Sequence, residues 1–373
     1  MSTPPTPISP IADERIRSID ATVPEDFEKL WRMWHIVFSS WPITRERLLA
    51  IFTLLPGAHH LMSEHGFVLA YLEGGKHGKI AAVGVMPAYQ GKGLGTKLLD
   101  RARDELEKAA WETEGEGKGK EKAGLKSLEI GSGTPRFWNM VPTSFPEELK
   151  AWFTRRGESL SPWDNGVVLM DTGFKKGDKV TRDLYRDIRG EIEIASPEVM
   201  EKVSQSHIEF RPWSPELEEE CLTKQRALFV SVTYIIRLAG QIANGQQSWY
   251  EGYEALAQYK QHDEVLVAID PETGAQIGWT FCCGPTAVIN GMYAFMPLMP
   301  SGDKTGLIAA VGIDPSTRGK GVGLAMMVKA VERLKERGVE GIQIDGTVLR
   351  GFYERIGFDT MWEFEQYAYD LGK

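Results

Sequence analysis

Residues 80–95 of the chain read IAAVGVMPAYQGKGLG, and residues 308–323 read IAAVGIDPSTRGKGVG. The two segments align without a gap and carry the same residue at 10 of 16 positions. Each begins with a short apolar run rich in β-branched residues, which is typical of a strand, and continues through a proline into closely spaced glycines. A coincidence of this quality is improbable, so the chain contains the same structural unit twice.

The sequence around each segment also repeats. A helical pattern of apolar residues follows each glycine turn, at about residues 93–110 and 321–337. After each helix we expect a strand, at residues 127–130 and 341–345, and then a short helix and a last strand. This order of strand, helix, strand, helix and strand predicts an α/β fold in each copy.

The repeat divides the 373 residues into two domains of ordinary size. We expect a disordered lead at residues 1–12, which is rich in Ser, Thr and Pro and lacks the apolar core of a signal peptide. The N-terminal domain is expected at residues 13–175, with a mobile insertion at 112–124 that is almost only Glu, Gly, Lys and Thr. A linker at 176–206 then leads to the C-terminal domain at 207–373.

Composition narrows the class of protein. The net charge of −9 argues against broad nucleic-acid binding, and no apolar run is as long as a membrane-spanning helix requires. We expect Cys221, Cys282 and Cys283 to be reduced thiols, because neighbours in sequence rarely bridge and an odd number forms no disulfide framework. No ligand spacing typical of a metal site occurs. The expectation is therefore a soluble, cytoplasmic protein that binds neither nucleic acid nor membranes and holds no metal.

The glycine turns predict a site for a diphosphate. They read Gln90-x-x-Gly93-x-Gly95 and Arg318-x-x-Gly321-x-Gly323. Glycines let the backbone pass close to an anion, and successive N–H groups together with the start of the following helix attract negative charge. No Gly-Lys-Ser/Thr ends either turn, which excludes a nucleotide-hydrolase loop, and the turn comes too late in each unit for a dinucleotide fingerprint.

On these residues the sequence resembles the GCN5-related N-acetyltransferase (GNAT) family, whose signature is Gln/Arg-x-x-Gly-x-Gly/Ala after a strand that ends near a proline. The resemblance implies two tandem folds of that family, each a central, mixed and splayed β-sheet flanked by helices, with acetyl-CoA as the cosubstrate. Its pyrophosphate is expected on the glycine turns, and its pantetheine arm along the strand before each turn. The residues implied are Val83, Gly84, Val85, Gln90, Gly91, Lys92, Gly93, Leu94, Gly95 and Thr96 in the first copy, and Val311, Gly312, Ile313, Arg318, Gly319, Lys320, Gly321, Val322, Gly323 and Leu324 in the second.

Acetyl transfer to an amine needs a base for the amine, polarisation of the thioester carbonyl, and an acid for the departing thiolate. In the family a Tyr on the helix after the fifth strand commonly supplies this acid, and Tyr353 in the stretch YERIGF matches it. The first copy has Phe153 at the aligned position, so the resemblance places the chemistry in the second copy. The alternative for Tyr353 is a buried ring whose hydroxyl has a partner in the protein.

Asp345 is the candidate base, because it ends a predicted strand where the fold of the family opens its substrate cleft. The alternative is a cap for a following helix. Asp314 is the second candidate for the substrate's amine, and its place directly before a proline also suits a turn. Trp249 and Tyr253 follow a loop rich in Gly and Gln and are candidates for the wall of the substrate cleft.

The presence of two copies in one chain restricts the resemblance to the tandem members of the family. Residues 131–138 read GSGTPRFW and residues 344–347 read IDGT, and both stretches look like the glucosamine/glucosaminide N-acetyltransferases. The acceptor implied is a small-molecule amine, an amino sugar, and the enzyme is expected as a monomer or homodimer. A rigid loop with Arg136 packed and free of ligand is the alternative for the first stretch. The alternatives for the whole chain are a protein or histone lysine acetyltransferase and a non-catalytic sensor of acetyl-CoA or amino sugar.

Overall fold

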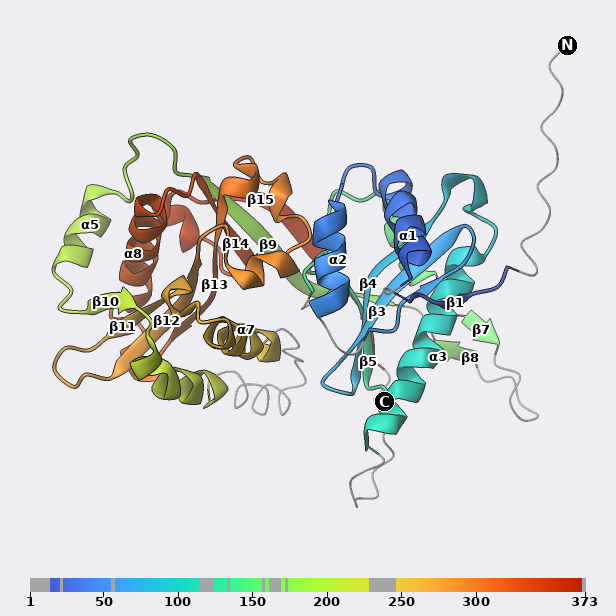
Figure 1. Cartoon of the computed structure of the whole chain (residues 1–373), viewed down its shortest axis with the longest axis horizontal. Coiled ribbons are helices and arrows are strands. Elements are labelled where there is room, and N and C mark those ends of the chain that lie inside the picture. Colours follow the sequence, from blue (N-terminus) through green and yellow to red (C-terminus); the bar gives the residue numbers. More distant parts are fainter. Residues whose placement is uncertain are drawn as a thin grey trace, which may run out of the picture. The chain divides into compact units, whose positions relative to one another are not determined.

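The computed structural model describes residues 14–20, 23–54, 58–114, 124–132, 135–155, 158–160, 169–171, 174–227 and 246–370. The chain forms two compact units, each coloured by sequence in Figure 1. Unit 1 comprises Met1–Ser132, Trp152–Lys175 and Tyr367–Lys373, and unit 2 comprises Gly133–Ala151 and Lys176–Gln366. The expected lead at 1–12 lies outside the described residues, as does most of the expected insertion.

Unit 1 contains the first copy of the repeat. Strand β4 carries the repeated apolar run, pairs antiparallel with β3 and parallel with β5, and is followed by helix α3. The end of α3 includes residues 112–114, which the sequence had placed in the insertion. The elements of this unit are β1 (Arg17–Ser18), α1 (Pro24–Val37), α2 (Arg45–Leu54), β2 (Leu61–Met62), β3 (Gly66–Glu73), β4 (His77–Val85), α3 (Leu94–Glu114), β5 (Ser127–Ile130), β7 (Glu158–Leu160) and β8 (Leu169–Asp171).

Unit 2 repeats this arrangement. Strand β13 pairs antiparallel with β12 and parallel with β14, and helix α8 connects β13 to β14. Residues 218–227 are also helical. The elements are β6 (Val141–Pro142), β9 (Lys175–Asp187), α5 (Pro197–Ser204), β10 (Glu209–Pro212), α7 (Gln246–Gln258), β11 (Val265–Ile269), β12 (Gln276–Cys283), β13 (Thr305–Ile313), α8 (Val322–Glu336) and β14 (Gly341–Thr347). Helix α4 (Glu147–Thr154) and strand β15 (Asp359–Asp370) each contribute residues to both units.

The stretch 176–206 is not a linker. Its first part is β9, which pairs antiparallel with β14, and its second part includes helix α5, whose Val199 and Val203 lie in the same buried cluster as α8. Charged residues in β9 hid the strand, because Arg182, Asp183 and Arg186 are buried in its C-terminal half, whereas charged residues are usually exposed. The segment expected to separate the copies is thus part of the core of unit 2.

The sheet of unit 2 is packed on both faces. Leu266 and Ala268 of β11 lie in one buried cluster with α8, whereas Val265 and Val267 lie in another with α7. This split follows from the period of two along a strand, and Figure 1 shows the two helices on either side of the strands. The predicted mixed sheet flanked by helices is therefore confirmed.

Both copies distort the strand that leads into the turn. The antiparallel register shifts between Leu69 and Ala70 in unit 1 and between Trp279 and Phe281 in unit 2. Opposite the second shift, Ala310 adopts φ +51, a conformation that residues with a Cβ rarely adopt. The parallel pairing of β13 with β14 ends at Ile308 and Ile344. Beyond these residues the two strands are no longer hydrogen-bonded to each other, and this opens the sheet beside the turn.

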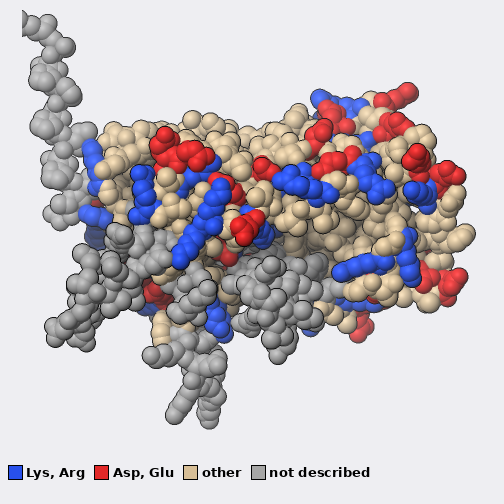
Figure 2. Space-filling model, turned by 180° about the vertical axis from the view of Figure 1, so that it is seen from behind, with Lys and Arg blue, Asp and Glu red and all other residues tan. Residues whose placement is uncertain are grey.

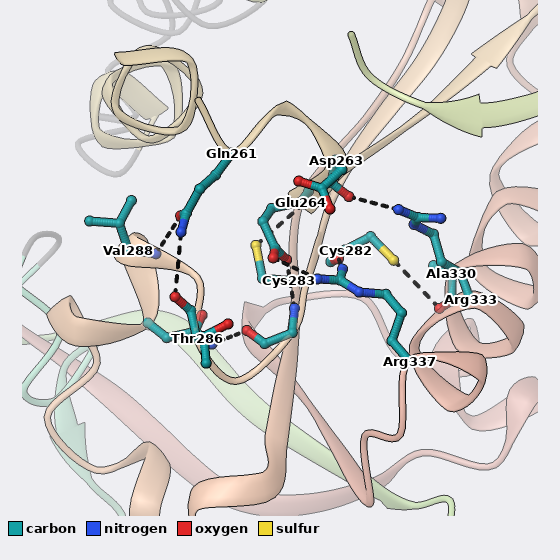
Figure 3. Close-up of polar contacts among 12 residues, drawn as sticks. Gln261, Asp263, Glu264, Cys282, Cys283, Thr286, Val288, Ala330, Arg333 and Arg337 are labelled. Atoms are coloured by element: carbon teal, nitrogen blue, oxygen red, sulfur yellow. Dashed lines mark hydrogen bonds and ion pairs between the residues drawn. The ribbon is translucent and has the colours of Figure 1, made fainter. Parts of the chain in front are cut away.

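The cysteines of β12 are inert parts of a polar cluster at the end of that strand (Figure 3). All three cysteines of the chain are free and buried. Burial raises the pKa of Cys282 to about 12 and that of Cys283 well above its usual value, so neither thiol is a nucleophile at neutral pH. Glu264 binds Arg337 at 2.6 Å and the amide of Gly284 at 2.7 Å, which fixes the chain after β12.

Candidate active site

A cavity of about 1130 Å³ lies beside the second glycine turn, in unit 2. Its walls come from the end of β13, the turn, the first residues of α8, the end of α5 and the segment around Tyr353. Every cosubstrate residue predicted in the second copy lines it: Val311, Gly312, Ile313, Arg318, Gly319, Lys320, Gly321, Val322, Gly323 and Leu324. Its size is just above the usual range for ligand pockets, about 300–1,000 Å³.

The turn itself has the geometry of an anion cradle. Gly319 and Gly321 adopt φ +80 and φ +84, which favours glycine, and α8 begins directly after them without a side-chain cap at its N-terminus. The first N–H groups of a helix have no partner within the helix, so those of α8 are available to an anion. The Arg318 guanidinium donates to the Ile313 carbonyl at 3.3 Å and braces the turn against the strand.

The first copy builds the same turn but surrounds it differently. Gly91 and Gly93 adopt φ +72 and φ +84, and Gln90 donates to the Val85 carbonyl at 3.0 Å, the position that Ile313 holds in the second copy. Gln90 and Arg318 therefore make the equivalent hydrogen bond in the two copies, from the turn to the end of the preceding strand. Lys92, however, lies 5.2 Å from the centre of the Tyr89 ring and so has an aromatic partner near the turn.

Tyr353 lines the cavity and is 6% exposed. Burial raises its pKa to about 12, and a hydrogen bond with the Thr347 side chain opposes that rise. The hydroxyl is therefore protonated at neutral pH, as an acid for a thiolate must be. At the aligned position Phe153 packs against Phe174 and Tyr367, in an aromatic cluster of unit 1.

Asp345 is buried and held by three side chains from other parts of unit 2. Arg136 forms an ion pair with it at 3.1 Å, Asn139 donates to it at 3.2 Å, and the Tyr293 hydroxyl donates to it at 3.4 Å. All three partners are side chains. Among the described residues no helix N–H donates to Asp345, so the alternative that it caps a helix is wrong. Asp345 does not line the large cavity.

Asp183, on β9, is the member of this cluster that the sequence did not reveal. It accepts hydrogen bonds from Asn139 at 2.8 Å, from the Gly346 amide at 2.9 Å and from Gln343 at 3.3 Å. Burial and the neighbouring charge of Asp345 raise the pKa of Asp183 to about 8. Its place in a stretch interpreted as a linker concealed it, since only the pairing of β9 with β14 brings it to Asp345.

The cluster encloses a small space of about 10 Å³, the size of one water molecule. The buried Gln343 carbonyl oxygen, in a side chain that lines this space, has no hydrogen-bond partner. With one proton on the acid pair, the charges of Asp183, Asp345 and Arg136 sum to zero, which lowers the cost of burying them. The site is thus a mostly buried cluster, neutral overall, at the end of β14.

The structure places the other three residues predicted to bind substrate, Trp249, Tyr253 and Asp314, in three different parts of unit 2. Trp249 is half-buried, with the Arg136 guanidinium 4.9 Å from its ring centre, so it belongs to the edge of the acid cluster. The expectation for Tyr253 is wrong, because its ring is fully buried on the inner face of α7 and its hydroxyl donates to the Ala310 carbonyl at 3.1 Å. Asp314 caps the short turn that follows it, accepting from the Ser316 amide at 2.9 Å.

Comparison with known proteins agrees with this geometry. The model of the acetyltransferase (GNAT) family matches residues 27–115 and 241–358, which together make up more than half of the chain. The chain belongs to the GNAT acetyltransferase family. It is accordingly an N-acetyltransferase built from two GNAT folds in tandem, and enzymes of this family use acetyl-CoA. No curated protein matches the chain.

Three solved structures resemble the whole of this GNAT chain in fold. The first is the GCN5-related glucosamine N-acetyltransferase region of a fungal multi-domain GH3 β-N-acetylglucosaminidase, with a TM-score of 0.75 and 21% identity, over 96% of this chain and 38% of that one. The second is a GCN5-related N-acetyltransferase from Sphaerobacter thermophilus, with a TM-score of 0.60 and 14% identity, over 95% of each chain. The third is a tandem GNAT protein from the clavulanic acid biosynthesis pathway, with a TM-score of 0.55 and 11% identity, over 97% of this chain and 99% of that one.

Two kinds of feature are absent from the described residues. Among the described residues, no helix is both long and apolar enough to cross a bilayer. Within the same residues, no group of three or more His, Cys, Asp or Glu side chains is placed to hold a metal ion.

Proposed function

We propose that unit 2 transfers the acetyl group of acetyl-CoA to the primary amine of glucosamine or of a terminal glucosaminide. The observation that carries the proposal is the cavity itself, because it joins an uncapped helix start and a glycine cradle to the buried hydroxyl of Tyr353. A diphosphate fits the cradle, and the thioester end then reaches Tyr353.

The chemistry assigned to this chain is a transfer of one acetyl group and the movement of protons. The free amine attacks the thioester carbonyl, a C–N bond forms, and the C–S bond breaks. Tyr353 donates its proton to the departing thiolate, and the proton that the nitrogen loses passes through solvent, which returns one to Tyr353. The acid pair of Asp183 and Asp345 lies at the end of the strand that also carries Thr347, the hydrogen-bond partner of Tyr353. We assign Asp345 the role of orienting the acceptor side of the site through Arg136.

The acceptor class rests on two observations of different weight. The fungal glucosamine N-acetyltransferase region has the same fold over nearly the whole chain. In addition, Trp249 is half-buried at the edge of the acid cluster, and the flat face of an aromatic ring suits a sugar ring. Phe153 lacks the hydroxyl of Tyr353, so a site in the first copy can bind the cosubstrate without transferring acetyl. This favours a binding role, and no catalytic one, for the first copy.

A thiol-release assay with acetyl-CoA and glucosamine, on wild type and Tyr353→Phe, tests the proposal. We expect turnover by the wild type and a kcat lower by about 10²-fold in the variant, with the KM for acetyl-CoA little changed. Glucosaminide oligomers and a lysine-containing peptide serve as further acceptors. Binding of acetyl-CoA with no release of thiol for any amino sugar would reject the acceptor, and transfer to the peptide alone would favour a protein acetyltransferase.

A further inference from the structure

The charge of the large cavity differs from that of the protein. Its lining contains four basic residues and no Asp or Glu, in a chain whose net charge is −9. The four are Lys202, Arg318, Lys320 and Arg355. On the face drawn in Figure 2, by contrast, basic and acidic side chains are interspersed among the described residues. A concave surface of one sign concentrates the field, so this cavity attracts a polyanion.

None of the four basic residues forms an ion pair with a carboxylate in the part of the chain that the structure describes. The acid next to Arg355 is already engaged, because Glu354 binds Arg182 at 2.8 Å. The charge on Arg355 is therefore not cancelled by its neighbour. Lys202 and Arg355 are both exposed, which leaves their charged ends accessible from the cavity.

The four residues fall into two groups by the elements that carry them. Arg318 and Lys320 belong to the glycine turn, whereas Lys202 comes from α5 and Arg355 from the short helix Tyr353–Ile356. The second group is outside the turn altogether. Lys202 also lies outside both segments that match the family model.

The two elements of the second group are fixed in place. The last turn of α5 is anchored by Val203, which is buried against α8. Arg186 donates to the carbonyl of Ile194 at 2.7 Å and also to that of Ile356, so one buried guanidinium ties the approach to α5 to the end of the short helix. The two basic side chains are thus presented by rigid supports and not by a loose loop.

We propose that Lys202 and Arg355 form a second phosphate site, which binds the 3′-phosphate on the ribose of coenzyme A, separate from the turn that binds the diphosphate. This inference rests on the proposed function, since it concerns the same cosubstrate. The diphosphate is matched by the N–H groups of the turn and by Arg318 and Lys320. A phosphomonoester carries close to two negative charges at neutral pH, and one Lys and one Arg match it in charge and in donors.

The test compares coenzyme A with 3′-dephospho-coenzyme A, which lacks only the phosphate in question, by calorimetric binding at fixed ionic strength. For the wild type we expect coenzyme A to bind at least tenfold more tightly. In Lys202→Ala and Arg355→Ala the preference should fall several-fold, and in the double variant it should approach one. Binding of the dephospho compound should stay as in the wild type throughout.

The matched control is Lys329→Ala on α8, whose ammonium is paired with Glu332 at 2.8 Å and which does not line the cavity. It should keep the wild-type preference, and Arg355→Lys should keep most of it. A wild-type preference in the double variant would overturn the second site alone. Failure of the wild type to bind either compound would overturn the cosubstrate assignment as well, so the two failures are distinguishable.

Discussion

Asp183 and Asp345 accept hydrogen bonds from the same nitrogen, the side-chain amide of Asn139, at 2.8 and 3.2 Å. The two carboxyl groups come from neighbouring antiparallel strands, β9 and β14. Burial raises the pKa of Asp183, and the like charge of Asp345 adds to that rise, whereas Asp345 pairs with Arg136. The pair therefore behaves as one unit that holds a proton at neutral pH.

The first prediction concerns Asp345→Asn. The change leaves Arg136 buried without its ion pair, and removing one member of a buried pair costs about 3–5 kcal/mol. We expect the free energy of unfolding to fall by about 3 kcal/mol and kcat to fall by about 10²-fold. Urea unfolding and the thiol-release assay measure the two effects.

Asp314→Asn is the control for that variant, because the Asp314 carboxylate caps an exposed turn. It should lower stability by at most about 1 kcal/mol and leave kcat unchanged. If the kcat of Asp345→Asn equals that of the wild type, the acid pair has no role in the reaction.

The second prediction is a pH dependence that comes from Asp183. Its pKa is about 8 in the folded protein and near 3.8 when unfolded, so between these values only the folded state holds the proton. The contribution of Asp183 to stability is then fully present below pH 3.8 and is lost progressively as the pH rises to about 8, by up to about 1.4 kcal/mol per pH unit.

Asp183→Asn imitates the protonated acid and removes this titration. Other groups that face Asp183 are Asp345, Arg136 and Tyr293. They are unchanged in the variant. Unfolding by urea at pH 5, 6, 7 and 8 should therefore show the stability of the wild type falling relative to that of the variant as the pH rises. Parallel curves for the two proteins would mean that Asp183 is ionised throughout.

The third prediction compares the two glycine turns. Gly93 and Gly321 both adopt φ +84, and a Cβ added at either meets no atom within 4 Å. Gly93→Ala and Gly321→Ala therefore introduce the same backbone strain, about 1–2 kcal/mol, with no clash. We expect similar losses of stability, but only Gly321→Ala should raise the KM for acetyl-CoA, by tenfold or more. Equal effects on KM would place a working site in the first copy too.

The sequence was sufficient for features that depend on neighbouring residues. The turns and the helices after them follow from glycine spacing and helical periodicity, and the structure starts α3 and α8 within a residue or so of the expected positions. Asp183 was out of reach, because its partner lies more than 160 residues away and only strand pairing joins them. Tyr253 was misplaced for a related reason. Its position on α7 is local, but which face of α7 meets β13 is decided by packing.

The last prediction concerns the support at the end of β12 (Figure 3). Glu264 is 5% exposed and its carboxylate binds both Arg337 and the Gly284 amide. Glu264→Gln keeps the size of the side chain but removes the ion pair of Arg337, so we expect a loss of about 3 kcal/mol. Glu340→Gln is the matched control, because Glu340 forms an exposed pair with Lys304 and should cost at most about 1 kcal/mol. Urea unfolding of both variants gives the comparison. Equal, small losses would show that the buried ion pair does not stabilise this end of the sheet, whereas a large loss confined to Glu264→Gln would show that it does.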